Sequence, residues 1–205
     1  MPGLITYVDG FNLYHGLHDR YRHRFLWLDL VELTRQLRPA DELTKVRYFT
    51  APVLDDSPAA SRQSSYLQAL TAHNGPMIDI VQGRYQRKPK QCRQCGSTWT
   101  SYEEKETDVN IAVSLVADIA TGQATSAMII SADSDLGPAV RMARSLAPST
   151  HIVAAFPPRR QSTELRNLMP SSFTIGRGRI AASQLPETVK DPITGHSIER
   201  PEKWR

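Results

Sequence analysis

The stretch "IISADSDLGPAV" (129–140) places two aspartates, Asp133 and Asp135, directly after an apolar segment. Residues 126–133 predict a buried strand, and the sequence after Gly137 and Pro138 predicts a helix that runs to about residue 146. Carboxylates at the point where a strand turns into a helix occupy a common position for a metal site in α/β proteins. One aspartate is explained as the cap of the next helix. The second is left over, and other carboxylates of the chain are its natural partners.

Strands and helices alternate along the rest of the chain. A turn and a helix follow Asp9, Ser57 is the predicted N-cap of the helix after the second strand, and the third strand is expected to bend at Gly83. This order predicts one α/β domain with a mostly parallel sheet and helices on both faces. The predicted strands are 4–9, 43–51, 77–86, 126–133, 151–157 and 173–176, and the main helices are 28–37, 57–72, 103–120, 139–146 and 162–169.

The chain changes character at about residue 177. Residues 1–176 carry the alternating pattern, whereas residues 177–205 hold proline, glycine and charge with little periodicity. We therefore expect a domain over 1–176 and an extended C-terminal tail over 177–205, laid over the domain or over a partner.

The composition is that of an ordinary globular protein, with 205 residues, 40% hydrophobic and 22% charged. No apolar run is long enough to span a membrane, no signal peptide is recognised, and two cysteines do not make a disulfide framework, so the sequence predicts a cytoplasmic protein. The net charge of +4 favours an anionic partner, and basic residues cluster at 83–93, 157–161 and 176–179.

Acidic residues recur at the ends of the predicted strands. Asp9 ends the first strand as Asp133 ends the fourth, and Asp108 lies at the start of the strongest helix. Four carboxylates that converge would repel one another, and a Mg²⁺ or Mn²⁺ ion removes that penalty. The sequence thus predicts an acidic metal site from Asp9, Asp108, Asp133 and Asp135, with Asn12 holding a carboxylate or a metal-bound water.

Each acid also has a structural explanation. Asp9 could satisfy the amides of a turn, Asp108 could favour a helix start, and Asp135 could cap a helix. His15 and His18, three residues apart on the helix after Asp9, could be acid–base groups or could face solvent.

Three blocks of the sequence resemble the signature blocks of the NYN domain family, which belongs to the PIN-like nucleases. They are "YVDGFNLYHGL" (7–17), "EEKETDVNIAVSLVADIA" (103–120) and "MIISADSDLGPAVRMA" (128–143). The resemblance covers about residues 4–175, and the tail is similar to an ending found in bacterial members. It implies a Rossmann-like sheet with an acidic pocket and metal-dependent RNA cleavage.

The resemblance assigns roles to particular residues. Asp9, Asp108, Asp133 and Asp135 match the acidic positions of the family, and Asn12 matches its supporting asparagine. Thr107 and Ser131 adjoin the pocket, and Lys105 could face a substrate phosphate. We expect the basic residues Arg84, Arg87, Lys88 and Lys90 to hold the backbone of a single-stranded RNA, with Tyr85, Trp99 and Tyr102 either stacking on bases or packing the loop.

The sequence therefore predicts a Mg²⁺- or Mn²⁺-dependent ribonuclease. One alternative comes from the same resemblance, because some bacterial proteins of similar layout are assigned to NADH-dependent hydroxylation of pyridine-type aromatics. The residues add nothing to it, since no G-x-G-x-x-G follows the first strand. A third hypothesis is a non-catalytic RNA-binding module.

Cys92 and Cys95 form a C-x-x-C turn in the basic loop, which is half of a zinc site. Two chains could pool their cysteines around one Zn²⁺, residues of the fold could complete the site, or the pair could carry no metal. The first option predicts a homodimer through this loop, and the tail is a second candidate for a dimer contact.

Overall fold

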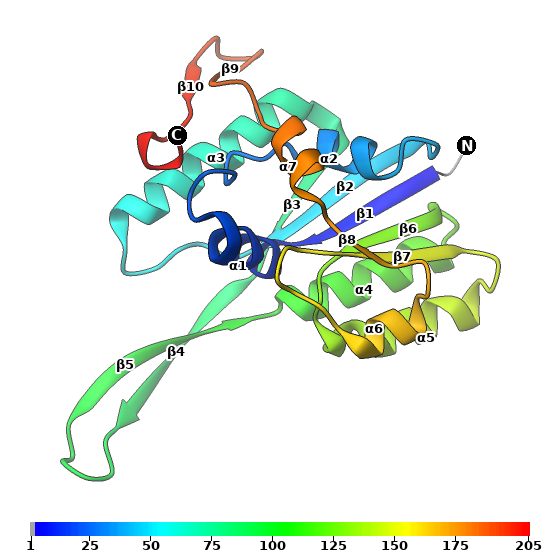
Figure 1. Ribbon diagram of the computed structural model, residues 1–205. Coiled ribbons are helices and arrows are strands. Elements are labelled where there is room, and N and C mark those ends of the chain that lie inside the picture. The colour runs from blue at the N-terminus through cyan, green and yellow to red at the C-terminus, as the bar shows by residue number, and fades with distance from the viewer. Residues whose placement is uncertain (1–2) are drawn as a thin grey trace.

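The computed structural model describes residues 3–205, apart from the side chains of residues 101, 103 and 104. A six-stranded sheet in the order β3-β2-β1-β6-β7-β8 forms its centre, and every neighbouring pair in it is parallel. Helices cover both faces of this sheet (Figure 1). The predicted α/β fold with a mostly parallel, Rossmann-like sheet is confirmed. The strands are β1 (Gly3–Asp9), β2 (Leu43–Thr50), β3 (Ile78–Gln82), β6 (Ala124–Ile130), β7 (His151–Phe156) and β8 (Phe173–Thr174).

Strand β1 lies between β2 and β6 and is buried along its whole length. Its alternate side chains enter two separate cores, because successive residues of a strand point to opposite faces. Leu4 and Val8 pack in one core, and Ile5 and Tyr7 pack in the other. The first core is covered by α1 (Gly10–Tyr21), α2 (Leu30–Leu37) and α3 (Ser57–Asn74), and the second by α4 (Thr107–Ala120), α5 (Gly137–Leu146) and α6 (Thr163–Leu168).

Several helices begin at a side-chain cap that the sequence contains. Asp29 caps α2, and Ser162 caps α6 as predicted. The predicted cap of α3, Ser57, is wrong by one residue. Asp56 accepts the hydrogen bond from the Ala59 amide and so takes the position that Ser57 was expected to fill.

The third predicted strand and the loop after it differ from the structure. The chain leaves the sheet at the buried Gly83, and β4 (Arg84–Gln91) pairs with β5 (Thr98–Lys105) in an antiparallel ribbon. We call β4 and β5 the ribbon. It projects from the body of the molecule (Figure 1). Helix α4 begins at Thr107 rather than at residue 103, because Glu106 has a left-handed backbone with φ 81° that interrupts the helix.

The C-terminal segment 177–205 contains short regular elements and packs on the domain. It forms α7 (Arg177–Ala182), the hairpin of β9 (Thr188–Lys190) and β10 (Ser197–Glu199), and the turn η3 (Glu202–Trp204). The Leu185 amide donates to the Trp27 carbonyl at 3.0 Å, and the Trp27 indole donates to the Pro186 carbonyl at 2.7 Å. Of the two places expected for this tail, the structure has it over its own domain. Sequence periodicity misses such short elements because each has too few residues to repeat a pattern.

Two further short helical turns complete the description. They are η1 (Gly75–Met77) before β3 and η2 (Ser134–Leu136) before α5. None of the helices within residues 3–205 is long and apolar enough to cross a bilayer.

Candidate active site

A hollow of about 330 Å³ opens at the carboxyl ends of β1, β6 and β7. This edge is where parallel sheets place their functional groups, because the strands end there together. The residues around it come from β1, α1, α4, the turn after β6 and the loop after β7. They are Asp9, Phe11, Asn12, His15, Asp108, Asp133 and Arg160.

Asp9 is a buried residue of the hollow that hydrogen bonds hold in place. It ends β1, and only 4% of it is exposed. Its Oδ1 accepts a hydrogen bond from the Asn12 amide at 2.9 Å, and its Oδ2 accepts one from the Ser131 hydroxyl at 2.8 Å. Glycine at position 10 lets the chain after Asp9 pass close to β2, because a Cβ there would lie only 2.5 Å from the Phe49 carbonyl oxygen. The carboxylate is therefore held by both its own turn and the neighbouring strand.

The same network joins the ends of β1 and β6. The Ser131 hydroxyl accepts the Asp133 amide at 3.0 Å, and the Asn12 side-chain oxygen accepts the Ala132 amide at 3.1 Å. Asn12 thus orients the segment that carries Asp133. Every group in this chain of contacts has a fixed direction, which is what a site that binds a charged ligand requires.

Three of the four predicted acids surround the hollow. Asp108, in the first turn of α4, and Asp133 lie there with Asp9, whereas the exposed Asp135 does not line it. Asp133 caps the turn η2, because its Oδ1 accepts the Asp135 amide at 2.9 Å. The capping role that the sequence suggested for Asp135 is therefore filled by Asp133.

The donor set suits a hard cation, although the acids stand around the hollow rather than in one tight cluster. Within the described part of the chain, no three His, Cys, Asp or Glu side chains are already grouped as metal ligands. Carboxylate and amide oxygens are nevertheless the ligands that Mg²⁺ and Mn²⁺ prefer. Burial also raises the pKa of Asp9, and the nearby Asp133 charge raises it further, against the hydrogen bonds from Asn12 and Ser131 that lower it. A buried carboxylate of this kind gains from a nearby cation.

The raised pKa of Asp9 leads to a prediction for stability. The folded protein holds the proton of the Asp9 carboxyl group more tightly than the unfolded chain does. The stability that this protonation contributes is full below the ordinary aspartate pKa and is lost as the pH rises through the raised pKa. In EDTA, we expect the melting temperature of the wild type to fall relative to that of Asp9→Asn as the pH rises above about 4, the ordinary aspartate pKa. Thermal melts of both proteins across this range measure the difference. A difference that does not change with pH would contradict the assignment.

Two polar residues of the hollow were not among the predicted site residues. Arg160, in the loop after β7, donates from Nη2 to Asp19 at 2.5 Å, and its buried Nε has no hydrogen-bond partner among the described residues. Gly16 lets α1 approach this loop, because a Cβ there would lie 2.7 Å from the Pro157 side chain. The signal in the sequence was the basic cluster directly after strand 151–157. His15, the second residue, lines the hollow from α1.

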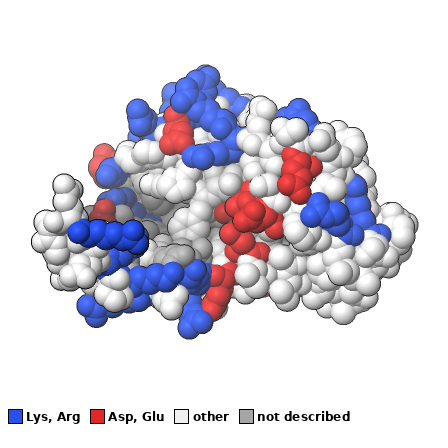
Figure 2. Space-filling model, turned by 90° about the horizontal axis from the view of Figure 1, so that it is seen from below, with Lys and Arg blue, Asp and Glu red and all other residues white. Residues whose placement is uncertain are grey.

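The predicted substrate-binding residues all lie on the ribbon, and none of them lines the hollow. Figure 2 shows an acidic patch near the middle of the lower face and basic side chains gathered on the side from which the ribbon projects. Arg84 pairs with Glu106, and Arg87 Nη2 donates to the Thr100 hydroxyl at 3.3 Å. Lys105, at the end of β5 beside α4, is the predicted basic residue nearest in sequence to Asp108. The remaining two, Lys88 and Lys90, follow on β4.

The C-x-x-C pair lies at the tip of the ribbon. The Cys92 amide donates to the Ser97 carbonyl at 2.8 Å, the Gly96 amide donates to the Cys92 carbonyl at 3.0 Å, and Gly96 has φ 71°. The two thiols lie within hydrogen-bonding reach of each other. Among the described residues, no third His, Cys, Asp or Glu is grouped with them as a metal ligand. Zinc binding and the dimer stay predictions.

The surroundings of Cys95 at this tip predict a reactive thiol. Hydrogen bonds from the Ser97 side chain and backbone, and from Cys92, lower the pKa of Cys95 to about 7. We expect alkylation of Cys95 by iodoacetamide in the reduced, metal-free protein to reach half its maximal rate near pH 7, and Ser97→Ala to move that midpoint upward. Thr100→Ala is the matched control. Mass spectrometry of the peptide measures the rates, and a midpoint near 8.5 in all three proteins, as for a free thiol, would contradict the prediction.

A parallel sheet with carboxylates around its carboxyl edge is the architecture of the PIN-like, Rossmann-like class. The chain belongs to the NYN domain family, whose sequence profile matches residues 4–175. This is a nuclease-like family. The match confirms the membership predicted from the three sequence blocks.

Two individual proteins are similar to this chain. The 6-hydroxy-3-succinoylpyridine 3-monooxygenase HspA of Pseudomonas putida is 27% identical over 239 residues, covering 97% of this chain and 74% of the relative. A crystal structure of a protein of unknown function from Vibrio parahaemolyticus aligns with TM-score 0.55 and 17% identity, covering 85% of this chain and 93% of that chain. The second likeness supports the fold alone.

Proposed function

We propose that this protein is a metal-dependent ribonuclease that hydrolyses phosphodiester bonds of single-stranded RNA. The observation that carries the proposal is the gathering of Asp9, Asp108, Asp133 and Asn12 around one hollow at the carboxyl edge of an NYN domain. A nuclease needs carboxylates held against their own repulsion, together with room for a phosphate, and this hollow supplies both.

The three lining carboxylates would hold Mg²⁺ or Mn²⁺, without the exposed Asp135, which does not line the hollow. A bound ion of this kind lowers the pKa of a water molecule and stabilises the charge on a phosphate. Hydrogen bonds from the Asn12 amide and the Ser131 hydroxyl hold the two oxygens of the Asp9 carboxylate in place beside the hollow.

Positive groups beside the hollow would position the RNA. The Arg160 guanidinium lines the hollow, and guanidinium groups match phosphate oxygens in geometry. The basic side chains of the ribbon would hold the backbone farther from the reacting phosphate. His15, which lines the same hollow, would exchange a proton with a leaving oxygen.

The test is cleavage of a 5′-labelled single-stranded RNA by the purified protein with Mn²⁺. We expect cleavage that EDTA abolishes, that added Mn²⁺ restores, and that is weaker on a DNA strand of the same sequence. An RNA that stays intact at every Mn²⁺ and Mg²⁺ concentration would overturn the proposal. Salt-dependent RNA binding without cleavage would then favour the non-catalytic binding module.

The aromatic hydroxylase is the alternative that the same assay separates. The activity in the name of the Pseudomonas putida relative is that protein's own, and 27% identity does not transfer it. Consumption of NADH with a hydroxypyridine, unaffected by RNA, would replace the ribonuclease proposal by this alternative.

A further inference from the structure

A second and larger pocket of about 520 Å³ lies beside the acidic hollow. It is enclosed by α1, the loop after it, the end of β2, α3 and the C-terminal turn η3, and it shares Phe11 and His15 with the hollow. Pockets of 300–1,000 Å³ are the usual size for small molecules. Its last wall comes from residues 203 and 204, which lie outside the match to the NYN family.

The floor of this pocket consists of fixed aromatic rings. Tyr66 and Trp204 meet edge to face with their centroids 5.9 Å apart, and Tyr48 packs edge to face on Tyr66 at 6.3 Å. The Tyr66 hydroxyl donates to the Leu28 carbonyl at 2.7 Å, which holds the ring in place. Across the pocket stands Tyr14, which stacks on His18 at 5.8 Å. Such walls favour a flat ring, because aromatic faces and edges attract one another.

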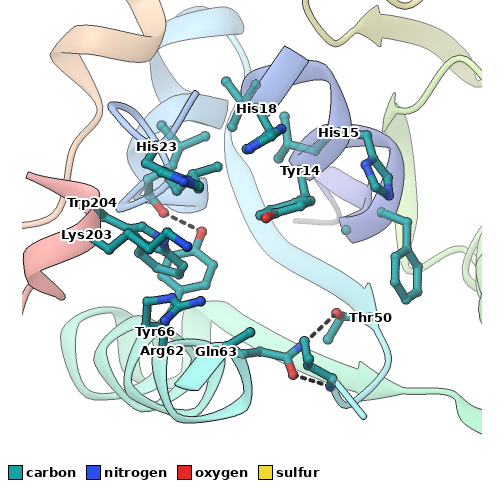
Figure 3. A pocket seen from close by; sticks show the side chains of 18 of the residues that line it. Tyr14, His15, His18, His23, Thr50, Arg62, Gln63, Tyr66, Lys203 and Trp204 are labelled. Atoms are coloured by element: carbon teal, nitrogen blue, oxygen red, sulfur yellow. Dashed lines mark hydrogen bonds between the residues drawn. The ribbon is translucent and has the colours of Figure 1, made fainter. Parts of the chain in front are cut away.

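One end of the pocket is positively charged. Figure 3 shows Arg62, Lys203 and His23 together at this end, next to Tyr66 and Trp204, with Tyr14 and His15 at the other end. Among the described residues, Arg62 and Lys203 take part in none of the ion pairs, and the buried His23 Nδ1 has no hydrogen-bond partner.

The acids near this end are already engaged. Asp56 lines the pocket, but its Oδ1 accepts the Ala59 amide as the cap of α3. Asp19 lies 4.0 Å from His18 and pairs with Arg160. Burial, followed by the charges of Lys203, His18, Arg62 and Arg22, lowers the pKa of His23. Neither Arg62 nor Lys203 therefore forms an ion pair with these acids, and His23 favours its neutral form.

We propose that this pocket binds one planar aromatic anion of about the size of a nucleotide. Its ring would lie against Tyr66 and Trp204, and its acidic group would lie among Arg62, Lys203 and His23. A nucleotide, free or within an RNA, and a free aromatic carboxylic acid share this chemistry. The site does not depend on the proposed function, because none of its cationic residues lines the acidic hollow.

The experiment is isothermal titration calorimetry of the full chain with two groups of probes. One group is UMP and AMP, with uridine and adenosine as uncharged controls, and the other is benzoate and nicotinate, with benzamide and nicotinamide as controls. Probe concentrations reach about 10 mM, where even sites with a millimolar Kd fill. We expect the anions of at least one group to bind at least about tenfold more tightly than their uncharged controls, since a charge-assisted hydrogen bond contributes this much. The group that binds identifies the source of the ligand.

Variants locate the site. Arg62→Gln and Lys203→Gln are each expected to weaken binding about tenfold, whereas Arg35→Gln and Lys190→Gln, on exposed surfaces elsewhere, leave it unchanged. Thermal melts check that all four variants fold. The proposal is overturned if no anion binds, or if the double variant Arg62→Gln, Lys203→Gln binds as tightly as the wild type. RNA cleavage plays no part in the readout, so failure here leaves the proposed function untouched.

Discussion

Replacing Asp133 by asparagine is expected to lower Mn²⁺-dependent RNA cleavage roughly a thousandfold, since a metal ion contributes several kcal/mol of charge stabilisation. Asparagine has nearly the same shape and is itself a good helix cap, so the hydrogen bond from the Asp135 amide can persist. The change therefore removes the negative charge and leaves the local fold in place. Initial rates on a labelled single-stranded RNA, with both proteins purified identically, measure the effect.

Asp135→Asn is the matched control for this prediction. Asp135 lies two residues away, is exposed and does not line the hollow, so we expect a loss of less than about tenfold, in line with the small effect of changing an exposed residue. Equal losses in both variants would show that the metal set includes all four predicted acids. Wild-type cleavage by Asp133→Asn would contradict the mechanism.

Replacing Trp27 by alanine is expected to lower the free energy of unfolding by about 3–5 kcal/mol, the usual cost of truncating a buried aromatic residue. Trp27 is completely buried, its indole donates to the Pro186 carbonyl, and its ring lies 6.4 Å from that of Trp204. The change therefore opens a cavity and also loosens the C-terminal segment. Urea unfolding followed by circular dichroism measures it.

Trp99→Ala is the control for the loss of a tryptophan as such. Trp99 lies on the ribbon and is 51% exposed. We expect its removal to change the unfolding free energy by no more than about 0.5 kcal/mol. If Trp27→Ala were equally mild, the C-terminal segment would not be part of the core.

Much of the site followed from local patterns. The apolar runs before Asp9 and Asp133 predicted strands, and the rule that parallel strands end at one edge was enough to place these two acids together. Asp108 followed because α4 begins almost directly before it. Asn12 lines the hollow, but its side-chain oxygen accepts the Ala132 amide, a contact between residues 120 positions apart that the sequence did not predict.

The position of Asp135 outside the hollow could not be predicted in the same way. A spacing of two residues leaves open which of two aspartates turns inward, and the choice depends on the hydrogen bonds of the turn η2. Ser57 and Asp56 offered the same ambiguity, since both are good caps and sit side by side. Neighbouring residues of similar chemistry cannot be told apart by pattern alone.

The sequence by itself determined the parallel sheet and the acidic edge, because periodicity and strand ends are local properties that each segment carries. Its three signature blocks determined the family. Only the tertiary structure decided that Arg160 and His15 face the acids and that Lys203 and Trp204 close a pocket against α3. These contacts join segments far apart in the chain. They are chosen by which surfaces remain to be buried once the sheet has formed, and no local pattern encodes that choice.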